Sequence, residues 1–451
     1  MSNNRLFFDY LATMGITDPM KVHKAIYKLS ILDYAEMMEK CYSFLETDFQ
    51  PANSNFEFIA SSTLSGEPFN NNDLIYRVYK ILQLADFAIL YSDVVWIRNP
   101  LEKYVHGIAS IFDENGIQNF ANDIFLLMEI RDLIYEGIIK IAATTKPFTK
   151  NELADIESNF PKNFRDRIKG LNNNLEEIFK DNLKFEVFEH EDELLIKFTA
   201  SGMVENAIER REGVLNWTHV KDKTPKFLKK ALKKESKLIS KKHYVKSGLL
   251  EHFIYPIIND LSMQNWFHHG YGQNYITDRE IDFELINKLN GQKPERNSQN
   301  ITKGLRHALP TLKNVRVEEL LKVRKNETDA FNVYRNSFNA ILDNGKNLSE
   351  DELKEFIKDA IQPQIDKIQH ALTSSKKTIK NKTAGEVVLG SAIFSAALFS
   401  GLVPIEYATG ITTLAGFHNT YKIGKGLWDY KSSEDQIRNN DYYFLWKTIN
   451  T

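Results

Sequence analysis

The chain has 451 residues and a mass of 52.2 kDa, a length that at roughly 150 residues per domain predicts two or three domains with sizeable buried cores. Hydrophobic residues make up 42% of the sequence and charged residues 26%, which excludes a disordered or fibrous protein. The 58 basic and 60 acidic residues give a formal net charge of -2, and this balance argues against a globally basic nucleic-acid binder. The single cysteine, Cys41, excludes a disulfide framework and multi-thiolate metal sites and favours a cytoplasmic location.

Residues 1–147 alternate between helical and strand-like patterns, and we assign them to a first domain. A helical stripe over 18–46 opens the segment, with an acidic N-cap followed by proline. Short strand-like runs follow at 56–61, 93–97 and 138–142, with helical patterns between them. This order predicts a small parallel βαβαβ sheet covered by helices.

Parallel sheets usually bind their ligands beyond the carboxyl ends of the strands, so the residues at those ends are of interest. The three predicted ends carry hydroxyl, amide and basic side chains: Ser61, Ser62, Arg98, Asn99, Thr144, Thr145 and Lys146. This composition suits an anion site, but loops that end strands contain the same residue types for conformational reasons. The sequence therefore favours ordinary polar loops here, and a hydrolase or transferase site at the strand ends is the alternative.

Residues 148–289 are predicted to form a helical middle domain with one β-hairpin. The hairpin pairs 185–188 with 194–198 across an acidic turn. The polar stretch 290–304 contains glycine, proline and asparagine and shows no periodicity. It is the predicted linker to a C-terminal helical domain over 305–451.

The stretch 265–275 combines aromatic residues, glycines and two adjacent histidines, a composition typical of a loop that approaches a ligand closely. His268 and His269 are its catalytic candidates, as general bases, and the alternative is an aromatic loop anchored on the core. No phosphate-binding, nucleophile-elbow, zinc-binding or dinucleotide motif is complete in the sequence. The sequence therefore predicts no metal and no cofactor, and it favours a non-enzymatic protein.

A strongly basic helix is predicted over 225–242. The surrounding stretch 221–246 holds eleven lysines against two acidic residues, a local charge of +9. Apolar residues form one stripe of the helix and lysines cover the remaining face. The lysines expected to contact an anionic partner are Lys226, Lys229, Lys230, Lys233, Lys234 and Lys237. An anionic membrane, a nucleic acid and a merely solvated helix face are the three interpretations that the pattern allows.

A run of nineteen uncharged residues extends from Val387 to Ile405, just long enough to cross a hydrocarbon core of about 30 Å as a helix. With the apolar residues up to 417 it predicts a helical hairpin, either inserted in a membrane or buried in a soluble domain. The expected lipid contacts are Phe394, Leu398, Phe399 and Leu402. The small residues expected to face a protein partner or a second copy of the chain are Ser391, Ser395, Ala397 and Gly401.

The predicted fold is mainly α-helical, with the small βαβαβ sheet near the N-terminus, the mid-chain β-hairpin and the C-terminal apolar helical hairpin. The leading hypothesis is a non-enzymatic intracellular effector or adaptor that engages a membrane, constitutively or on triggering, through 387–417 assisted by the basic helix 225–242. The alternatives are a nucleic-acid or phosphate-ligand binder that uses the basic helix and the loop 265–275, and a hydrolase or transferase. The expected location is the cytoplasm, with peripheral or inserted attachment at the inner face of the membrane.

Overall fold

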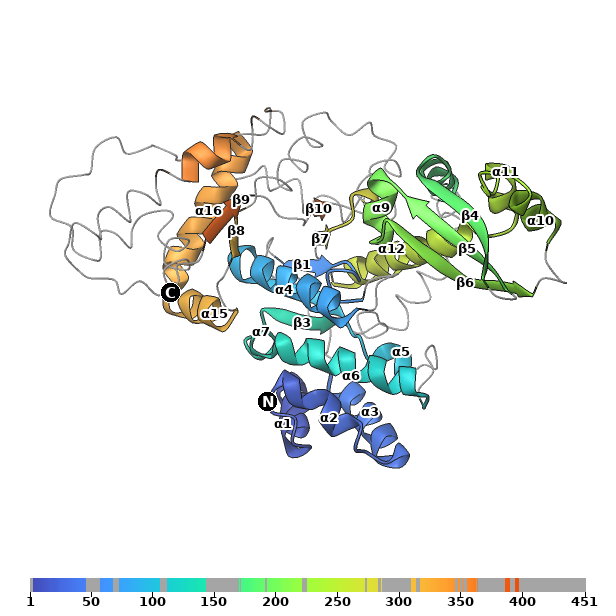
Figure 1. Cartoon of the computed structure of the whole chain (residues 1–451). Helices are drawn as coiled ribbons and strands as arrows, with labels where there is room; N and C mark the ends of the chain where they lie inside the picture. The colour runs from blue at the N-terminus through green and yellow to red at the C-terminus, as the bar shows by residue number, and fades with distance from the viewer. Residues whose placement is uncertain are drawn as a thin grey trace.

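The structure is a computed structural model that combines many helices with a small, largely parallel sheet and an antiparallel sheet (Figure 1). The residues it describes are 3–45, 57–67, 73–105, 112–142, 172–190, 193–220, 225–271, 274–282, 310–313, 317–344, 355–361, 386–389 and 394–396, with single residues at 170, 285, 348, 352 and 363. The predicted linker 290–304 lies outside the described residues. The predicted domain boundaries stay predictions.

The N-terminal helices are shorter than the sequence predicts. They are α1 (Asn3–Thr13), the 3-10 helix η1 (Pro19–Lys21), α2 (Val22–Ile26) and α3 (Ile31–Leu45). The single stripe predicted over 18–46 is wrong at Tyr27–Ser30, where the chain turns. Ser30 explains the break, because its Oγ accepts a 3.2 Å hydrogen bond from the Asp33 N–H and caps α3. Cys41 is buried in the core, as predicted.

The predicted βαβαβ sheet is confirmed. Strands β1 (Glu57–Ala60), β2 (Val94–Arg98) and β3 (Ile139–Ala142) are parallel neighbours in that order. Between them lie α4 (Leu74–Tyr91), α5 (Glu102–Val105), α6 (Glu114–Glu129) and α7 (Arg131–Tyr135).

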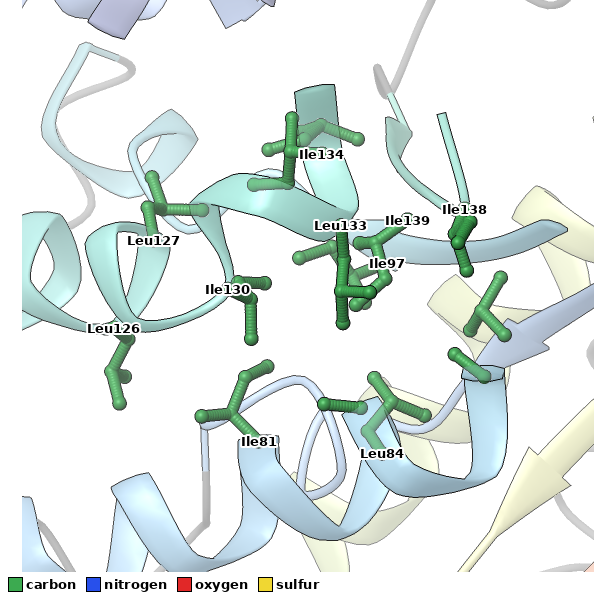
Figure 2. Close-up of a cluster of buried hydrophobic side chains, with 14 of the residues drawn as sticks. Ile81, Leu84, Ile97, Leu126, Leu127, Ile130, Leu133, Ile134, Ile138 and Ile139 are labelled. Atoms are coloured by element: carbon green, nitrogen blue, oxygen red, sulfur yellow. The ribbon is translucent and has the colours of Figure 1, made fainter. Parts of the chain in front are cut away.

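Both faces of this sheet are buried, since alternate residues of each strand enter two different cores. In β2, Val95 and Ile97 join the core that includes α4, α6 and α7, whereas Trp96 joins the core on the other face. Figure 2 shows part of the first core, where Ile81 and Leu84 of α4 point towards Ile130 and Leu133. The crossovers from β1 to β3 therefore cover one face.

Two further strands extend the sheet beyond the predicted element. Strand β7 (Asn274–Thr277) pairs with β1 in parallel, and β10 (Phe394–Ala396) pairs with β7 antiparallel, giving the order β10-β7-β1-β2-β3. The helix before β7, α12 (Glu251–Tyr271), packs in the core on the opposite face from α4. The strand order thus reverses between β1 and β7, which makes this place the topological switch point of the sheet.

The predicted mid-chain hairpin is confirmed as β4 (Leu183–His190) and β5 (Glu193–Ala200), which pair antiparallel. A third strand, β6 (Glu212–Val220), which the sequence analysis missed, pairs with β5. The short helix α9 (Gly202–Ile208) connects β5 to β6.

The basic helix predicted over 225–242 is wrong in its length. The segment forms two short helices, α10 (Lys226–Leu232) and α11 (Lys241–Lys246), with a turn between them. In that turn the Ile239 N–H donates to the Phe185 carbonyl at 2.9 Å, and the Val187 N–H donates to the Lys237 carbonyl at 3.1 Å. The helix breaks because this stretch satisfies backbone groups on the outer side of β4, which would otherwise be an open edge.

The described C-terminal helices pack on the first core. They are α15 (Val317–Asn326) and α16 (Thr328–Asn344), and β8 (Pro310–Lys313) pairs with β9 (Glu386–Leu389). The Arg324 guanidinium of α15 donates to the carbonyls of Ala88, Ile89 and Ser92 at 2.6 to 3.1 Å. It therefore adds donors to carbonyls at the C-terminal end of α4, where the backbone carbonyls lack the N–H groups of a following turn.

The apolar run 387–405 is predicted to be helical, but the parts of it that the structure describes are not helical. Of the predicted hairpin 387–417, the structure describes 387–389, in β9, and 394–396, which form β10. Both are strands, because β8 and β7 offer them open edges for pairing. The other residues of the hairpin, with Ser391, Ala397, Leu398, Phe399, Gly401 and Leu402, lie outside the described residues. No helix in the described part of the chain is both long and apolar enough to span a bilayer.

Candidate functional site

The candidate site lies at the switch point, where the chain leaves β1 and β7. After β1 the chain enters a turn at Ser61 and Ser62, and both are buried. At the end of β2, Asn99 is buried and Arg98 is partly buried. The remaining strand-end residues of the sequence analysis, 144–146, lie outside the described residues. The structure thus brings the first two strand ends together with a third, that of β7, which the sequence did not predict.

An ion pair joins α4 to the end of β7. Lys80 Nζ lies 2.5 Å from Asp278 Oδ2, and the Ser61 hydroxyl donates to Asp278 Oδ1 at 3.4 Å. Both charged side chains are buried. Buried ion pairs need additional hydrogen bonds to offset desolvation, and here a hydroxyl from the β1 end supplies one. Asp278 is therefore fixed between β1, β7 and α4.

Glu209 reaches the same place from the three-stranded sheet. It ends helix α9 in the left-handed conformation, with φ 58° and ψ 21°, a region that favours glycine or asparagine over glutamate. The helix end is tied to the β7 end, because Asn206 Oδ1 accepts a 3.1 Å hydrogen bond from the Glu280 N–H. Non-glycine residues in this conformation cost roughly 1–3 kcal/mol and cluster at functional sites.

The environment of Glu209 keeps its carboxyl group neutral to higher pH than usual. Burial, and next the charge of Asp278, raise the pKa of Glu209 to about 7. The Thr63 hydroxyl and the cations Arg279 and Lys80 act in the opposite direction. Since the raising effects dominate, Glu209 is a carboxylic acid that exchanges its proton near neutral pH, as general acid–base catalysis requires.

A second buried network holds the chain just after β7. The Arg279 guanidinium donates to Asp282 Oδ2 at 2.8 Å through Nε and pairs with Asp260 of α12. The hydroxyls of Tyr275 and Thr277 donate to the same Asp282 oxygen at 2.9 and 2.8 Å. These contacts fix the backbone on which Asp278 sits.

A third network fixes the turn that follows β1. Arg77 Nε donates to the Gly66 carbonyl at 2.6 Å, and the same guanidinium pairs with Asp123 of α6. Gly66 has a φ of +83°, and an added Cβ would meet a Leu126 methyl at 3.0 Å, so this turn needs glycine. The turn 61–67, with its buried polar residues Ser61, Ser62, Thr63 and Ser65, is thus held in one conformation beside the ion pair of Lys80.

The chain matches no family model, no curated protein and no solved structure. Its function must therefore be argued from the chemistry of this site. In the two networks of Lys80 and Arg279, three aspartates face two cations, so these two networks hold one carboxyl group more than they hold cations. Carboxylates around a reacting centre stabilise positive charge that develops there.

The other predicted site residues lie elsewhere. The loop predicted over 265–275 is wrong, because residues up to Tyr271 belong to α12 and 274–277 form β7. His268 and His269 therefore stand near the end of a helix. The lysines of 226–237 lie on and after α10. In the described part of the chain, no group of three or more histidine, cysteine, aspartate or glutamate residues is arranged to hold a metal ion.

Lys80, Glu209 and Arg279 are site residues that the sequence alone does not indicate. Neither Lys80 nor Arg279 belongs to a recognisable sequence motif. Lys80 is a single charged residue within α4, and Arg279 is a single charged residue after β7. The signal that was present is the short β-branched and aromatic run before Asp278, which marks a strand whose end carries charged residues. Glu209 is identified as a candidate by its left-handed backbone conformation and by the burial of its carboxyl oxygens, which only the structure shows.

Proposed function

We propose that the chain is a hydrolase or transferase that cleaves a glycosidic bond at the switch point, with Glu209 as the general acid and Asp278 as the carboxylate held by Lys80. This corresponds to the third of the hypotheses drawn from the sequence. The observation that carries it is Glu209, a half-buried glutamate in a strained conformation whose carboxyl oxygens are buried beside a second, ion-paired carboxylate. A carboxyl group with a raised pKa beside a carboxylate held in an ion pair is typical of such acid–base pairs.

The charge of the site supports this reaction class over phosphoryl transfer. Glycosidic cleavage passes through an oxocarbenium-like transition state, which carries positive charge. The excess carboxyl group of the Lys80 and Arg279 networks would stabilise that charge, whereas transfer of a phosphoryl group needs cations around the transferred oxygens. Glu209 would protonate the leaving group, and Asp278 would stabilise the developing positive charge or activate the attacking water or acceptor hydroxyl.

The test compares Glu209→Gln with Glu205→Gln, a control on the same helix α9. The probes are adenosine for an N-glycosidic bond and 4-nitrophenyl ribofuranoside and glucoside for O-glycosidic bonds. We expect turnover of at least one probe by the unaltered chain, a decrease of about 100-fold or more in Glu209→Gln, and little change in Glu205→Gln. Turnover that is equal in Glu209→Gln and the unaltered chain, or no turnover of any probe, contradicts the proposal.

We also propose, as a second function, membrane engagement through 387–417, the leading hypothesis from the sequence. It is supported by the uncharged composition of 387–405. Pairing of 394–396 with β7 weighs against insertion of these residues while the sheet is intact, so insertion would require β10 to leave the sheet edge. We expect co-sedimentation with anionic vesicles that decreases in Phe394→Lys. A chain that stays wholly in the supernatant under every condition would rule the second function out.

A further inference from the structure

A lysine surface lies on the segment that flanks β4, the edge strand of the three-stranded sheet. We define it as Lys226, Lys229, Lys230, Lys233, Lys234, Lys237, Lys241, Lys242 and Lys246, all of which are exposed. Helices α10 and α11, which carry most of them, lie side by side, since the rings of Phe227 and His243 stack with centroids 5.8 Å apart (Figure 1). The two helices therefore present their lysines as one surface.

This surface has little compensating charge. Residues 225–246 contain nine lysines and one acidic residue, Glu235, which is exposed. Lys241 pairs with Asp181 at 2.7 Å, and this is the ion pair that the described residues provide for these nine lysines. Such a density of like charge repels itself and lowers stability unless an anionic partner neutralises it.

The apolar residues of the two helices are already used in packing. Leu228 and Ala231 of α10 are 0% and 3% exposed, and Tyr244 of α11 is 2% exposed. They join the core under the three-stranded sheet. A helix that lies in a membrane interface needs a free apolar face to bury among the lipids, and the other apolar residues of α10 and α11, Phe227, Leu232 and Val245, are half-buried against the same core.

We propose that the lysine surface docks the phosphate backbone of a nucleic acid. The surface holds lysines without arginine, so it can neutralise phosphates but lacks the planar, bidentate donors that read guanine edges. Binding is therefore independent of base sequence and depends strongly on salt. The break between the two helices at 233–240 widens the surface available to a phosphate backbone, because it places the lysines on two adjacent helices instead of along one helix.

The test measures binding of a fluorescent 20-base-pair duplex by anisotropy from 50 to 300 mM NaCl. Each phosphate contact adds about 0.9 to the slope of log Kd against log salt. We expect Lys229→Gln with Lys230→Gln to reduce that slope by about 2 and to weaken binding at least tenfold at 100 mM salt. The matched control, Lys24→Gln with Lys28→Gln, removes two exposed lysines, one in α2 and one in the turn that follows it, and should leave both quantities unchanged.

Lysine-dependent duplex binding with the reduced slope supports the proposal. No binding at 50 mM salt, or equal binding by the two double variants, overturns it. A parallel arm uses vesicles of phosphatidylcholine with phosphatidylserine. If these vesicles bind through Lys229 and Lys230 while the duplex does not, a lipid surface is the partner and the nucleic-acid proposal fails. Circular dichroism of both variants verifies that the fold is retained.

Discussion

Replacing Arg279 with methionine is expected to lower the free energy of unfolding by about 3–5 kcal/mol. Arg279 is fully buried and pairs with Asp260 and Asp282. Its removal leaves two carboxylates in the interior close to each other, without the cation that both of them face. Urea unfolding followed by circular dichroism measures the effect.

The control for this prediction is Arg211→Met, at an exposed position directly before β6, where a change within about 0.5 kcal/mol is expected. If Arg279→Met does not fold, adding Asp260→Asn and Asp282→Asn should restore folding, since the buried charges are then removed together with their partner. Equal small effects at both arginines would show that the network does not hold the β7 end.

Replacing Glu209 with glutamine is expected to stabilise the protein above pH 7. The pKa of Glu209 is raised to about 7 from an ordinary value of 4.5, so the native state keeps this proton through a pH range in which the unfolded state has lost it. Ionising the buried carboxyl therefore costs stability progressively between these two values. Glutamine avoids this cost, which reaches at most about 3 kcal/mol above pH 7.

The informative quantity is the difference in unfolding free energy between Glu209→Gln and the unaltered chain as a function of pH. It should be small below pH 4.5 and rise to a plateau above pH 7. The unaltered chain alone is ambiguous, because burial also raises the pKa of Asp86 in α4 to about 7. Asp86→Asn serves as the control that removes this second contribution. A difference that does not depend on pH contradicts the prediction.

A glutamine variant that is more stable and less active would fit a general trade-off. Active sites hold charged groups in environments that cost stability, and their removal often stabilises the fold. Glu209 combines a left-handed backbone with a buried carboxyl, which are two separate costs at one residue. A residue that lowers the stability of the fold and has no structural role is a candidate for a functional role.

The local pattern of the N-terminal sheet was sufficient to predict it. The strands over β1, β2 and β3 are short β-branched or aromatic runs between amphipathic helices, and such alternation specifies a parallel sheet. The position of β7 beside β1 could not be predicted in this way, because 213 residues separate Ala60 from Asn274 and no local pattern encodes a long-range pairing. The candidate site lies where β7 pairs with β1, so its position could not be predicted from the sequence either.

The basic segment illustrates the opposite error. The helical spacing of apolar residues corresponds to a real helix in α10. The same spacing also predicts helix at Leu238 and Ile239, but these two residues are extended and pair with β4. The spacing of apolar residues gives no information about an open strand edge elsewhere in the fold, which can form hydrogen bonds with the same backbone groups that a helix would use. Tertiary pairing therefore overrode local helix propensity at this place.

The central claim is that the chemistry of the chain is located at the switch point, with Glu209 holding a proton near neutral pH. The most direct measurement is an NMR titration of the protein with 13C-labelled glutamate carboxyl groups, in which Glu209→Gln identifies the Glu209 signal. The account predicts a midpoint of about 7 for this carboxyl group. A midpoint near the ordinary value of 4.5 would contradict it.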